Sequence, residues 1–232
     1  MAPLDITTVS DEDIAKLRAM FFTDDADLTI YDEVDVEQLR NNDSLIRFYI
    51  THNRRNLDNA LVHIKRNLTW RKGYGINKLT EESFPQEMRD SKTYFLHGTD
   101  KTGNPVFYFR AKNLKRNKKE PDSLENWNRY FAYKFNEALQ SRGERRLAFV
   151  TDLNGIGMFT ADTDIINWQV KCLQDYFPDS TEYTLNLDMA LSLKAAWKII
   201  QLWLTEESKS RVKFASSKDL SNFIEPSQVA PQ

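Results

Sequence analysis

The chain has 232 residues, 28% of them charged, and a formal net charge of -2, so it can form one large domain or a small helical domain followed by a mixed one. Its hydrophobic fraction of 41% is close to that of globular proteins, and no uncharged apolar run reaches the roughly 18 residues that a membrane span needs. The N-terminal stretch MAPLDITTVSDED lacks the basic and apolar regions of a secretory signal, which predicts a cytoplasmic protein. Cys172 is the only cysteine, which excludes internal disulfides and zinc sites built from several cysteines.

Charge is distributed unevenly along the chain. Residues 1–37 contain eleven acidic residues against Lys16 and Arg18, and residues 110–119 (RAKNLKRNKK) contain six basic residues. The acidic region is most simply a solvated helical surface. The basic segment is either a solvated loop or a surface that meets the phosphates of a membrane or a nucleic acid.

The N-terminal third is predicted to be helical. Apolar residues recur at intervals of four, three and four within residues 35–72, at Leu57, Leu61, Ile64 and Leu68. Gly73 and Gly75 then supply stop signals. His52 and His63 lie eleven residues apart, about three helical turns, so they can share a face. Without a third convincing ligand, we interpret both as surface or core histidines rather than metal ligands.

After Pro85 the pattern changes to strands that alternate with helices. Strands are predicted at residues 93–98, 105–111, 146–153, 182–188 and 211–216. Helices are predicted at residues 123–142, 162–176, 188–207 and 217–224. Because strands joined through helices usually pair in parallel, we predict an α/β fold with a mixed, largely parallel sheet. The expected parts are a helical region at 1–85, a mixed domain at 86–225 and a flexible tail at 226–232.

Residues 188–207 (DMALSLKAAWKIIQLWLTEE) form an unusually apolar stretch. Lys194, Lys198 and Gln201 make one narrow polar stripe. The opposite face is wide and apolar. The stretch is too short and too charged to span a membrane, so on its own it is most simply an ordinary core helix.

Four stretches, in the same order, resemble the CRAL-TRIO family of Sec14-like lipid-binding and lipid-transfer proteins. They are residues 43–75 with an Arg-Phe pair and a closing Trp-Arg-Lys, 97–111 (HGTDKTGNPVFYFRA), 147–157 (LAFVTDLNGIG) and 173–204 (LQDYFPDSTEYTLNLDMALSLKAAWKIIQLWL). The Leu-His-Gly start of the hairpin and the aromatic-rich last segment are most similar to members that also carry a major-sperm-protein domain. The resemblance implies an α/β domain in which a gate helix covers an apolar pocket that holds one lipid, without covalent chemistry.

The resemblance also implies which residues form the site. The pocket residues are expected to be Leu96, Phe107, Leu147, Phe149, Leu185 and Leu187. The gate helix residues are expected to be Met189, Leu193, Ala196, Trp197, Ile200, Trp203 and Leu204. Hydroxyl groups with which other members hold phosphatidylcholine are absent from the first four pocket positions. An unpaired polar head group costs roughly 1–3 kcal/mol per group, so a more hydrophobic ligand, or a head group held elsewhere, is favoured.

Two further surfaces follow from the resemblance. A phosphatidylinositol head group is expected to meet Arg54, Arg55, Asp179 and Arg211, with ordinary surface ion pairs as the alternative. An anionic membrane is expected to meet Lys115, Arg116, Lys118 and Lys119. The expected partners are therefore a lipid or other hydrophobic small molecule and, transiently, a membrane surface, with no nucleic acid, metal or cofactor. The expected location is peripheral to a cytoplasmic membrane surface, with tethering to the endoplasmic reticulum if the chain belongs to a larger protein.

Two other classes of function stay open. One is a protein interaction module on the same fold, with a pocket packed shut by Phe107, Phe149, Trp197 and Trp203. The other is a nucleotide-dependent enzyme built on Gly155 and Gly157, which follow a predicted strand but lack the third glycine of a dinucleotide-binding turn. No nucleophile elbow, P-loop or H-E-x-x-H motif occurs, so the lipid carrier is favoured. The family's C-terminal Leu-Pro and Gly-Gly element is not recognisable at residues 226–232, which indicates a diverged or truncated end.

Overall fold

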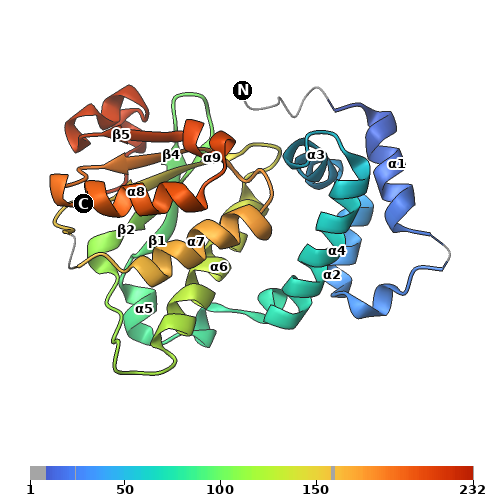
Figure 1. The fold of residues 1–232 in the computed structure, drawn as a ribbon, viewed down its shortest axis with the longest axis horizontal. Helices are drawn as coiled ribbons and strands as arrows, with labels where there is room; N and C mark the ends of the chain where they lie inside the picture. Colours follow the sequence, from blue (N-terminus) through green and yellow to red (C-terminus); the bar gives the residue numbers. More distant parts are fainter. Residues whose placement is uncertain (1–8, 24, 158–159, 232) are drawn as a thin grey trace. The chain divides into compact units, whose positions relative to one another are not determined.

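The computed structural model describes residues 9–23, 25–157 and 160–231, without the side chain of Ala196. The chain divides into two compact units. The first contains the chain up to Leu79 together with Cys172–Ser180, and the second contains Thr80–Lys171 together with the chain from Thr181 onward. Helix α7 (Thr163–Asp175) therefore begins in the second unit and ends in the first (Figure 1).

The first unit is helical, with short 3₁₀ turns η2 (Leu28–Ile30) and η3 (Ile76–Lys78). Its α-helices are α1 (Asp11–Phe21), α2 (Glu33–Asn41), α3 (Asp43–His52) and α4 (Leu57–Tyr74). The helical pattern predicted over residues 35–72 consists of the three helices α2, α3 and α4. The breaks occur where the side chains of Asn42 and Asn56 accept backbone N–H groups and cap the following helices. Gly75 ends α4 at a φ of 70°.

The segment Cys172–Ser180 folds as part of the first unit. Asn67 Nδ2 donates hydrogen bonds to the Tyr176 carbonyl at 2.9 Å and to the Tyr49 hydroxyl at 2.7 Å. The Trp70 ring stacks on the Tyr176 ring with centroids 3.9 Å apart. Cys172 is buried here, as expected for a small apolar side chain. This segment is thus held by α3 and α4, far from it in sequence.

The second unit is built on a five-stranded sheet in the order β1-β2-β3-β4-β5. The strands are β1 (Tyr94–Thr99), β2 (Pro105–Arg110), β3 (Leu147–Asp152), β4 (Thr181–Leu187) and β5 (Val212–Ala215). Strand β1 pairs antiparallel with β2 and the other neighbours pair in parallel, which confirms the predicted mixed, largely parallel sheet. Its α-helices are α5 (Gln86–Asp90), α6 (Ser123–Ser141), the first part of α7, α8 (Lys194–Trp203) and α9 (Glu206–Ser210).

Short 3₁₀ turns complete the second unit. They are η4 (Glu81–Ser83), η5 (Ala111–Asn113), η6 (Leu191–Leu193), η7 (Ser217–Asn222) and η8 (Pro226–Gln228). The helix predicted at residues 217–224 is therefore the 3₁₀ turn η7.

Strand register assigns alternate residues to two faces of the sheet. We call the face that carries Phe107, Phe149 and Phe214 the helix face. The α6 rings of Phe131 and Phe135 pack there, with Phe135 5.1 Å from Phe107 between ring centroids, and Trp197 of α8 packs on Phe214. We call the opposite face the tail face. It is covered by the C-terminal segment through Leu220, Ile224 and Ala230.

The C-terminal segment differs from the flexible tail predicted at residues 226–232. The turn η8 packs against β1, where the Gln228 side chain accepts a hydrogen bond from the Thr99 backbone at 3.3 Å. Ala230 is buried, and its N–H donates to the Tyr108 hydroxyl at 3.4 Å. The reason for the difference is the apolar tail face, which the C-terminal segment covers and which would otherwise meet water.

Gly98 tests the docking of this segment. Its φ of 64° is in the left-handed region, and a Cβ added to it would overlap the carbonyl oxygen of Gln228. We expect Gly98→Ala to lower the free energy of unfolding by about 2–3 kcal/mol, measured by urea denaturation. The matched control is Gly73→Ala on helix α4, where an added Cβ meets nothing within 4 Å and should raise stability by about 0.5–1 kcal/mol. Equal effects of the two changes would contradict a docked C-terminal segment.

Candidate functional site

The apolar stretch predicted as one helix over residues 188–207 is divided into three parts. Strand β4 ends at Leu187, Asp188 has a φ of 52°, and the turn η6 precedes α8. The Asp188 side chain accepts a hydrogen bond from the Ser217 N–H at 3.0 Å, which supports this conformation. Leu204 is extended, and α9 then begins at Glu206. The helix α8 is therefore only ten residues long, about 15 Å.

Helix α8 packs lightly on the helix face of the sheet. Trp197 meets Phe214 edge-on with ring centroids 5.1 Å apart. None of the described side chains of α8 is fully buried, and Leu202 and Ile199 are 81% and 52% exposed. Leu191, in the turn before the helix, is 77% exposed. The helix thus carries apolar side chains toward the protein and toward solvent.

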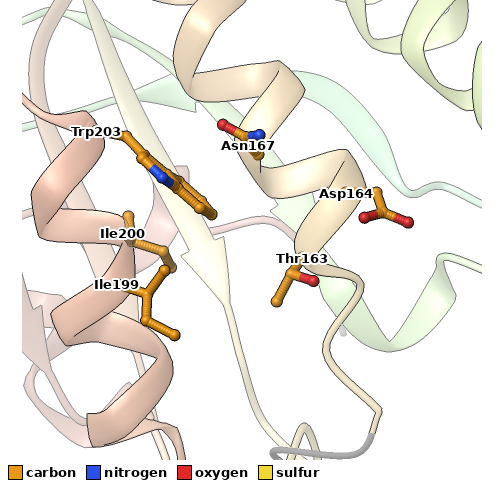
Figure 2. Close-up of a pocket in the computed structure, with 6 residues that line it drawn as sticks. All are labelled: Thr163, Asp164, Asn167, Ile199, Ile200 and Trp203. Carbon is orange, nitrogen blue, oxygen red and sulfur yellow. The ribbon is translucent and has the colours of Figure 1, made fainter.

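A cavity of about 190 Å³ lies between α7 and α8 (Figure 2). It is lined by Thr163, Asp164, Asn167, Ile199, Ile200 and Trp203. The last three extend from α8 toward α7, where Thr163 and Asn167 lie across from them, whereas the carboxylate of Asp164 points away from α8. The cavity is smaller than the roughly 300–1,000 Å³ of typical ligand pockets. It is too small to enclose a long-chain molecule.

Four of the cavity residues were not predicted from the sequence. Thr163, Asp164 and Asn167 belong to the first turns of α7, and Ile199 lies inside the apolar stretch. The only sequence signal was the spacing of Thr163 and Asn167, four residues apart and therefore on one side of a helix. Nothing in the sequence indicates that this side faces α8.

The predicted pocket residues are split between the two faces of the sheet. Phe107, Leu147 and Phe149 lie buried on the helix face, and Leu96 pairs with Phe107 but is 40% exposed. Leu185 and Leu187 instead pair with Val150 and Asp152 and belong to the tail face. The prediction that all six line one pocket is therefore wrong. Side chains alternate along a strand, so β4 turns its leucines to the tail face and Thr184 and Asn186 to the helix face.

The predicted gate residues have different environments. Ile200 and Trp203 line the cavity, and Trp197 packs on Phe214. Leu193 is buried in η6, whereas Met189 and Leu204 are half-buried on either side of the helical part. The side chain of Ala196 lies outside the described residues. Phe107 and Phe149 pack on each other with centroids 5.4 Å apart beneath the α6 rings, so the part of the predicted pocket nearest α6 is filled.

Arg116 does not belong to the exposed basic patch that was predicted to meet a membrane. The Arg116 guanidinium lies 2.9 Å from carboxylate oxygens of both Asp162 and Asp164, and its side chain is only 13% exposed. It is therefore an internal ion pair that holds the basic segment on the first turn of α7. Lys115, Lys118 and Lys119 are exposed.

The predicted head-group residues belong to different units. Arg54, Arg55 and Asp179 are in the first unit, and all three have positive φ values of 51°, 63° and 48°. Such a conformation costs roughly 1–2 kcal/mol per residue, and it is found at functional sites as well as at turns. Arg211 is in the second unit, where it donates hydrogen bonds to the Thr181 carbonyl at 2.7 Å and to the Glu207 carboxylate at 2.9 Å. Arg211 thus holds α9 on the start of β4.

His52 and His63 do not share the face of one helix, contrary to what their spacing predicts, because His52 ends α3 and His63 lies on α4; their ring centroids are 5.0 Å apart across the two helices. His63 Nε2 lies 2.9 Å from the Asp175 carbonyl oxygen, which can only accept, so this nitrogen carries the hydrogen. His63 Nδ1 then accepts from Asn53 Nδ2 at 3.2 Å. His52 Nδ1 accepts from the Asp179 N–H at 3.2 Å. Two neutral imidazoles therefore hold the backbone on either side of Pro178.

The described part of the chain contains neither a membrane-spanning helix nor a metal site built from three or more clustered side chains. None of its helices is long and apolar enough to cross a membrane. No group of three or more histidine, cysteine, aspartate or glutamate side chains in this part is arranged to hold a metal ion.

A family model decides the classification. The model described as the CRAL/TRIO domain matches residues 89–231, more than half of the chain. The chain belongs to the CRAL-TRIO family. Members of this family bind and transfer lipophilic ligands and are generally not enzymes. The resemblance inferred from the four sequence stretches is thus confirmed, whereas the finer likeness to members with a major-sperm-protein domain stays a prediction.

Relatives and a solved structure agree with this classification. A CRAL-TRIO domain-containing protein of Schizosaccharomyces pombe, C3H8.02, is 23% identical over 197 residues, which cover 81% of this chain and 44% of that protein. Patellin-3 of Arabidopsis thaliana is 28% identical over 194 residues, which cover 75% and 38%. The phosphatidylinositol/phosphatidylcholine transfer protein SFH13 of the same plant is 24% identical over 172 residues, covering 66% and 27%. The chain therefore spans less than half the length of these relatives.

The crystal structure of Sfh5 has the same fold. It superposes with a TM-score of 0.70 at 14% identity, covering 93% of this chain and 84% of that chain. At this identity the likeness concerns the fold alone, and it agrees with the α/β CRAL-TRIO architecture. The exact domain boundaries and the site residues stay predictions.

The histidine contacts predict how the stability of the first unit depends on pH. Burial lowers the pKa of His63, with smaller opposing contributions from the Asp175 carbonyl and carboxylate. As the pH falls through about 6.5, the unfolded chain binds a proton at this residue before the folded chain does, so stability is lost on acidification. We expect the free energy of unfolding to fall less between pH 7.5 and 5.5 in His63→Gln than in the unmodified protein.

The measurement is urea denaturation at the two pH values, followed by circular dichroism. His97→Gln, in the second unit, is the matched control and should retain the unmodified pH dependence. An unchanged pH dependence in His63→Gln would show that this histidine is not held neutral by the fold.

Proposed function

We propose that this chain binds a lipid or another hydrophobic small molecule beneath α8 and exchanges it at a membrane surface without covalent chemistry. The observation that carries the proposal is α8 itself, a short helix that is lightly packed and apolar on both sides. Its inner side chains Ile200 and Trp203 line the cavity, and its outer side chain Leu202 faces solvent. A helix of this kind suits a movable cover better than a core element.

The size of the cavity supports movement of the cover. Each buried CH₂ group contributes about 0.8 kcal/mol, so a lipid leaves a membrane readily only if most of its chain is covered. A cavity of about 190 Å³ covers only part of a long chain. Both ends of the lid are anchored by the contacts of Asp188 with Ser217 and of Arg211 with Glu207, while the helix between them has few contacts. Displacement of α8 between these anchors is the simplest way to enlarge the cavity.

The outer side of α8 supports contact with a membrane. Leu191 and Leu202 are exposed, and Lys194 and Lys198 are exposed on the same segment. Apolar side chains that enter the interface and lysines that meet anionic lipids are the usual elements of peripheral attachment. We therefore propose transient membrane contact through α8, with Lys115, Lys118 and Lys119 as a second basic surface.

One observation favours a second candidate, a protein interaction module. Phe107 and Phe149 pack beneath the α6 rings and fill the part of the predicted pocket nearest α6. If the remaining cavity never opens, the exposed apolar residues of α8 would instead dock on a partner protein.

Lipid mass spectrometry of protein purified under mild conditions tests the proposed function, together with lipid uptake from mixed vesicles. We expect one lipid class to be enriched in the purified protein relative to the host membranes. A reproducibly empty protein that takes up no lipid from vesicles would contradict the carrier and favour the interaction module.

Two substitutions on opposite sides of α8 separate binding from exchange. Ile200→Asp places a carboxylate in the cavity and is expected to lower lipid loading about tenfold. Leu202→Asp changes only the solvent side and is expected to lower vesicle association and transfer about tenfold while lipid already bound is retained. Lipid content by mass spectrometry and vesicle flotation are the two measurements.

Lys218→Asp, a charge change on the exposed part of η7, controls for nonspecific effects and should alter neither quantity. Circular dichroism establishes that each variant is folded. If Ile200→Asp and Leu202→Asp reduced lipid content equally, the division of α8 into an inner and an outer side would be wrong.

A further inference from the structure

We propose that the space beneath α8 selects an uncharged lipid with one hydroxyl or carbonyl group, which Asn167 binds, over a lipid whose head group is a phosphate. This inference rests on the proposed function and specifies its ligand class. It follows from the distribution of charge over the surfaces that face α8.

The helix face of the sheet carries no ionisable side chain among the paired residues of β2–β5, all of which are described. Its polar members are uncharged, namely Thr151, Thr181, Thr184 and Asn186. The ionisable residues Arg110, Asp152 and Lys213 pair on the tail face. Lys213 there lies over the Tyr183 ring, 4.3 Å from its centroid. The sheet beneath α8 therefore offers hydrogen-bonding groups but no counter-charge for a phosphate.

The α7 wall of the cavity has the same character. The Asn167 amide lies across from Ile200 and Trp203, whereas Thr163 turns its methyl group toward α8 and its hydroxyl away from it (Figure 2). An amide can donate to a carbonyl and can both donate to and accept from a hydroxyl. A single polar group among apolar surfaces is the usual composition of a site that orients a mostly apolar ligand.

The charged groups at the rim oppose a phosphate. The Asp164 carboxylate points away from α8 and pairs with Arg116, which also pairs with Asp162. The carboxylates of Asp162 and Asp164 together with the Arg116 guanidinium carry a net negative charge. Arg116 already forms ion pairs with both carboxylates. A phosphate that entered the cavity would lose its hydration without gaining a cationic partner from this wall, whereas a hydroxyl group would be satisfied by the Asn167 amide.

Three probes that differ only in the head end test this inference, each offered in phosphatidylcholine vesicles: 1-hexadecanol, hexadecane and hexadecyl phosphate. The measured quantity is the amount of deuterium-labelled probe recovered on the protein at equilibrium, by mass spectrometry. Because each variant is compared with the unmodified protein for the same probe, differences in vesicle partition cancel.

Asn167→Leu preserves the size of the side chain and removes its hydrogen bonds. We expect it to lower recovery of hexadecanol about 3–10-fold and to leave hexadecane unchanged or higher. Asp164→Asn removes one rim charge while Arg116 keeps its pair with Asp162, and we expect it to raise recovery of hexadecyl phosphate about threefold without changing hexadecanol. Asn222→Leu, at an exposed asparagine of η7, is the matched control and should change nothing.

The possible outcomes separate this inference from the proposed function. The selection of an uncharged ligand would be overturned if Asn167→Leu lowered the recovery of all three probes by the same factor. It would also be overturned if the unmodified protein preferentially recovered hexadecyl phosphate. Either result would leave the lipid carrier in place. Recovery of none of the probes, and of no vesicle phospholipid, would instead overturn the proposed function. Loss of hexadecanol alone supports the inference.

Discussion

The alternation of side chains along β4 and β5 is the constraint on which the arrangement of this CRAL-TRIO domain depends. Leu185, Leu187 and Lys213 belong to one face, and Thr184, Asn186 and Phe214 to the other. A shift of one residue in β5 would bury Lys213 beneath α8. A shift of one residue in β4 would turn Thr184 toward the apolar C-terminal segment. The register of the two strands therefore determines which face the C-terminal segment covers and which face α8 covers. It also determines which side chains of the sheet lie beneath α8.

The two coverings of the sheet differ in how firmly they hold. The C-terminal segment buries Leu220, Ile224 and Ala230 on the tail face and approaches Gly98 so closely that a side chain there would overlap it. Helix α8 buries none of its described side chains completely. Local opening costs least where few apolar contacts are lost, so α8 is expected to move at a much lower free energy than the tail. This difference allows one side of the sheet to open while the other keeps the strands together.

The sequence was most informative where local pattern and tertiary packing agree. The helix predicted at residues 123–142 is α6, and the buried run at 146–153 is β3. The sequence-based predictions failed where contacts between residues far apart in the sequence determine the structure. The leucines of β4 are more apolar than Thr184 and Asn186, so the strand pattern correctly predicted that the face with the leucines is buried. The pattern could not indicate that α8 covers the opposite face of the sheet. Likewise, the left-handed Asp188 that shortens the lid depends on a hydrogen bond from Ser217, 29 residues away.

Helix α7 belongs in part to each of the two units. Helix α7 supplies the Thr163 and Asn167 wall of the cavity at one end, and at the other it continues into a segment whose Tyr176 ring is stacked on Trp70. Without α3 and α4, this segment would lose that stacking and the amide donated by Asn67, leaving large aromatic surface in water. The four-residue spacing that places Thr163 beside Asn167 requires α7 to stay helical through its first turns, while its last turn is fixed by the first unit. Thr163 and Asn167 lie in the second unit together with α8, so the cavity belongs to that unit alone, and the lightly packed α8 is expected to be its more easily moved wall.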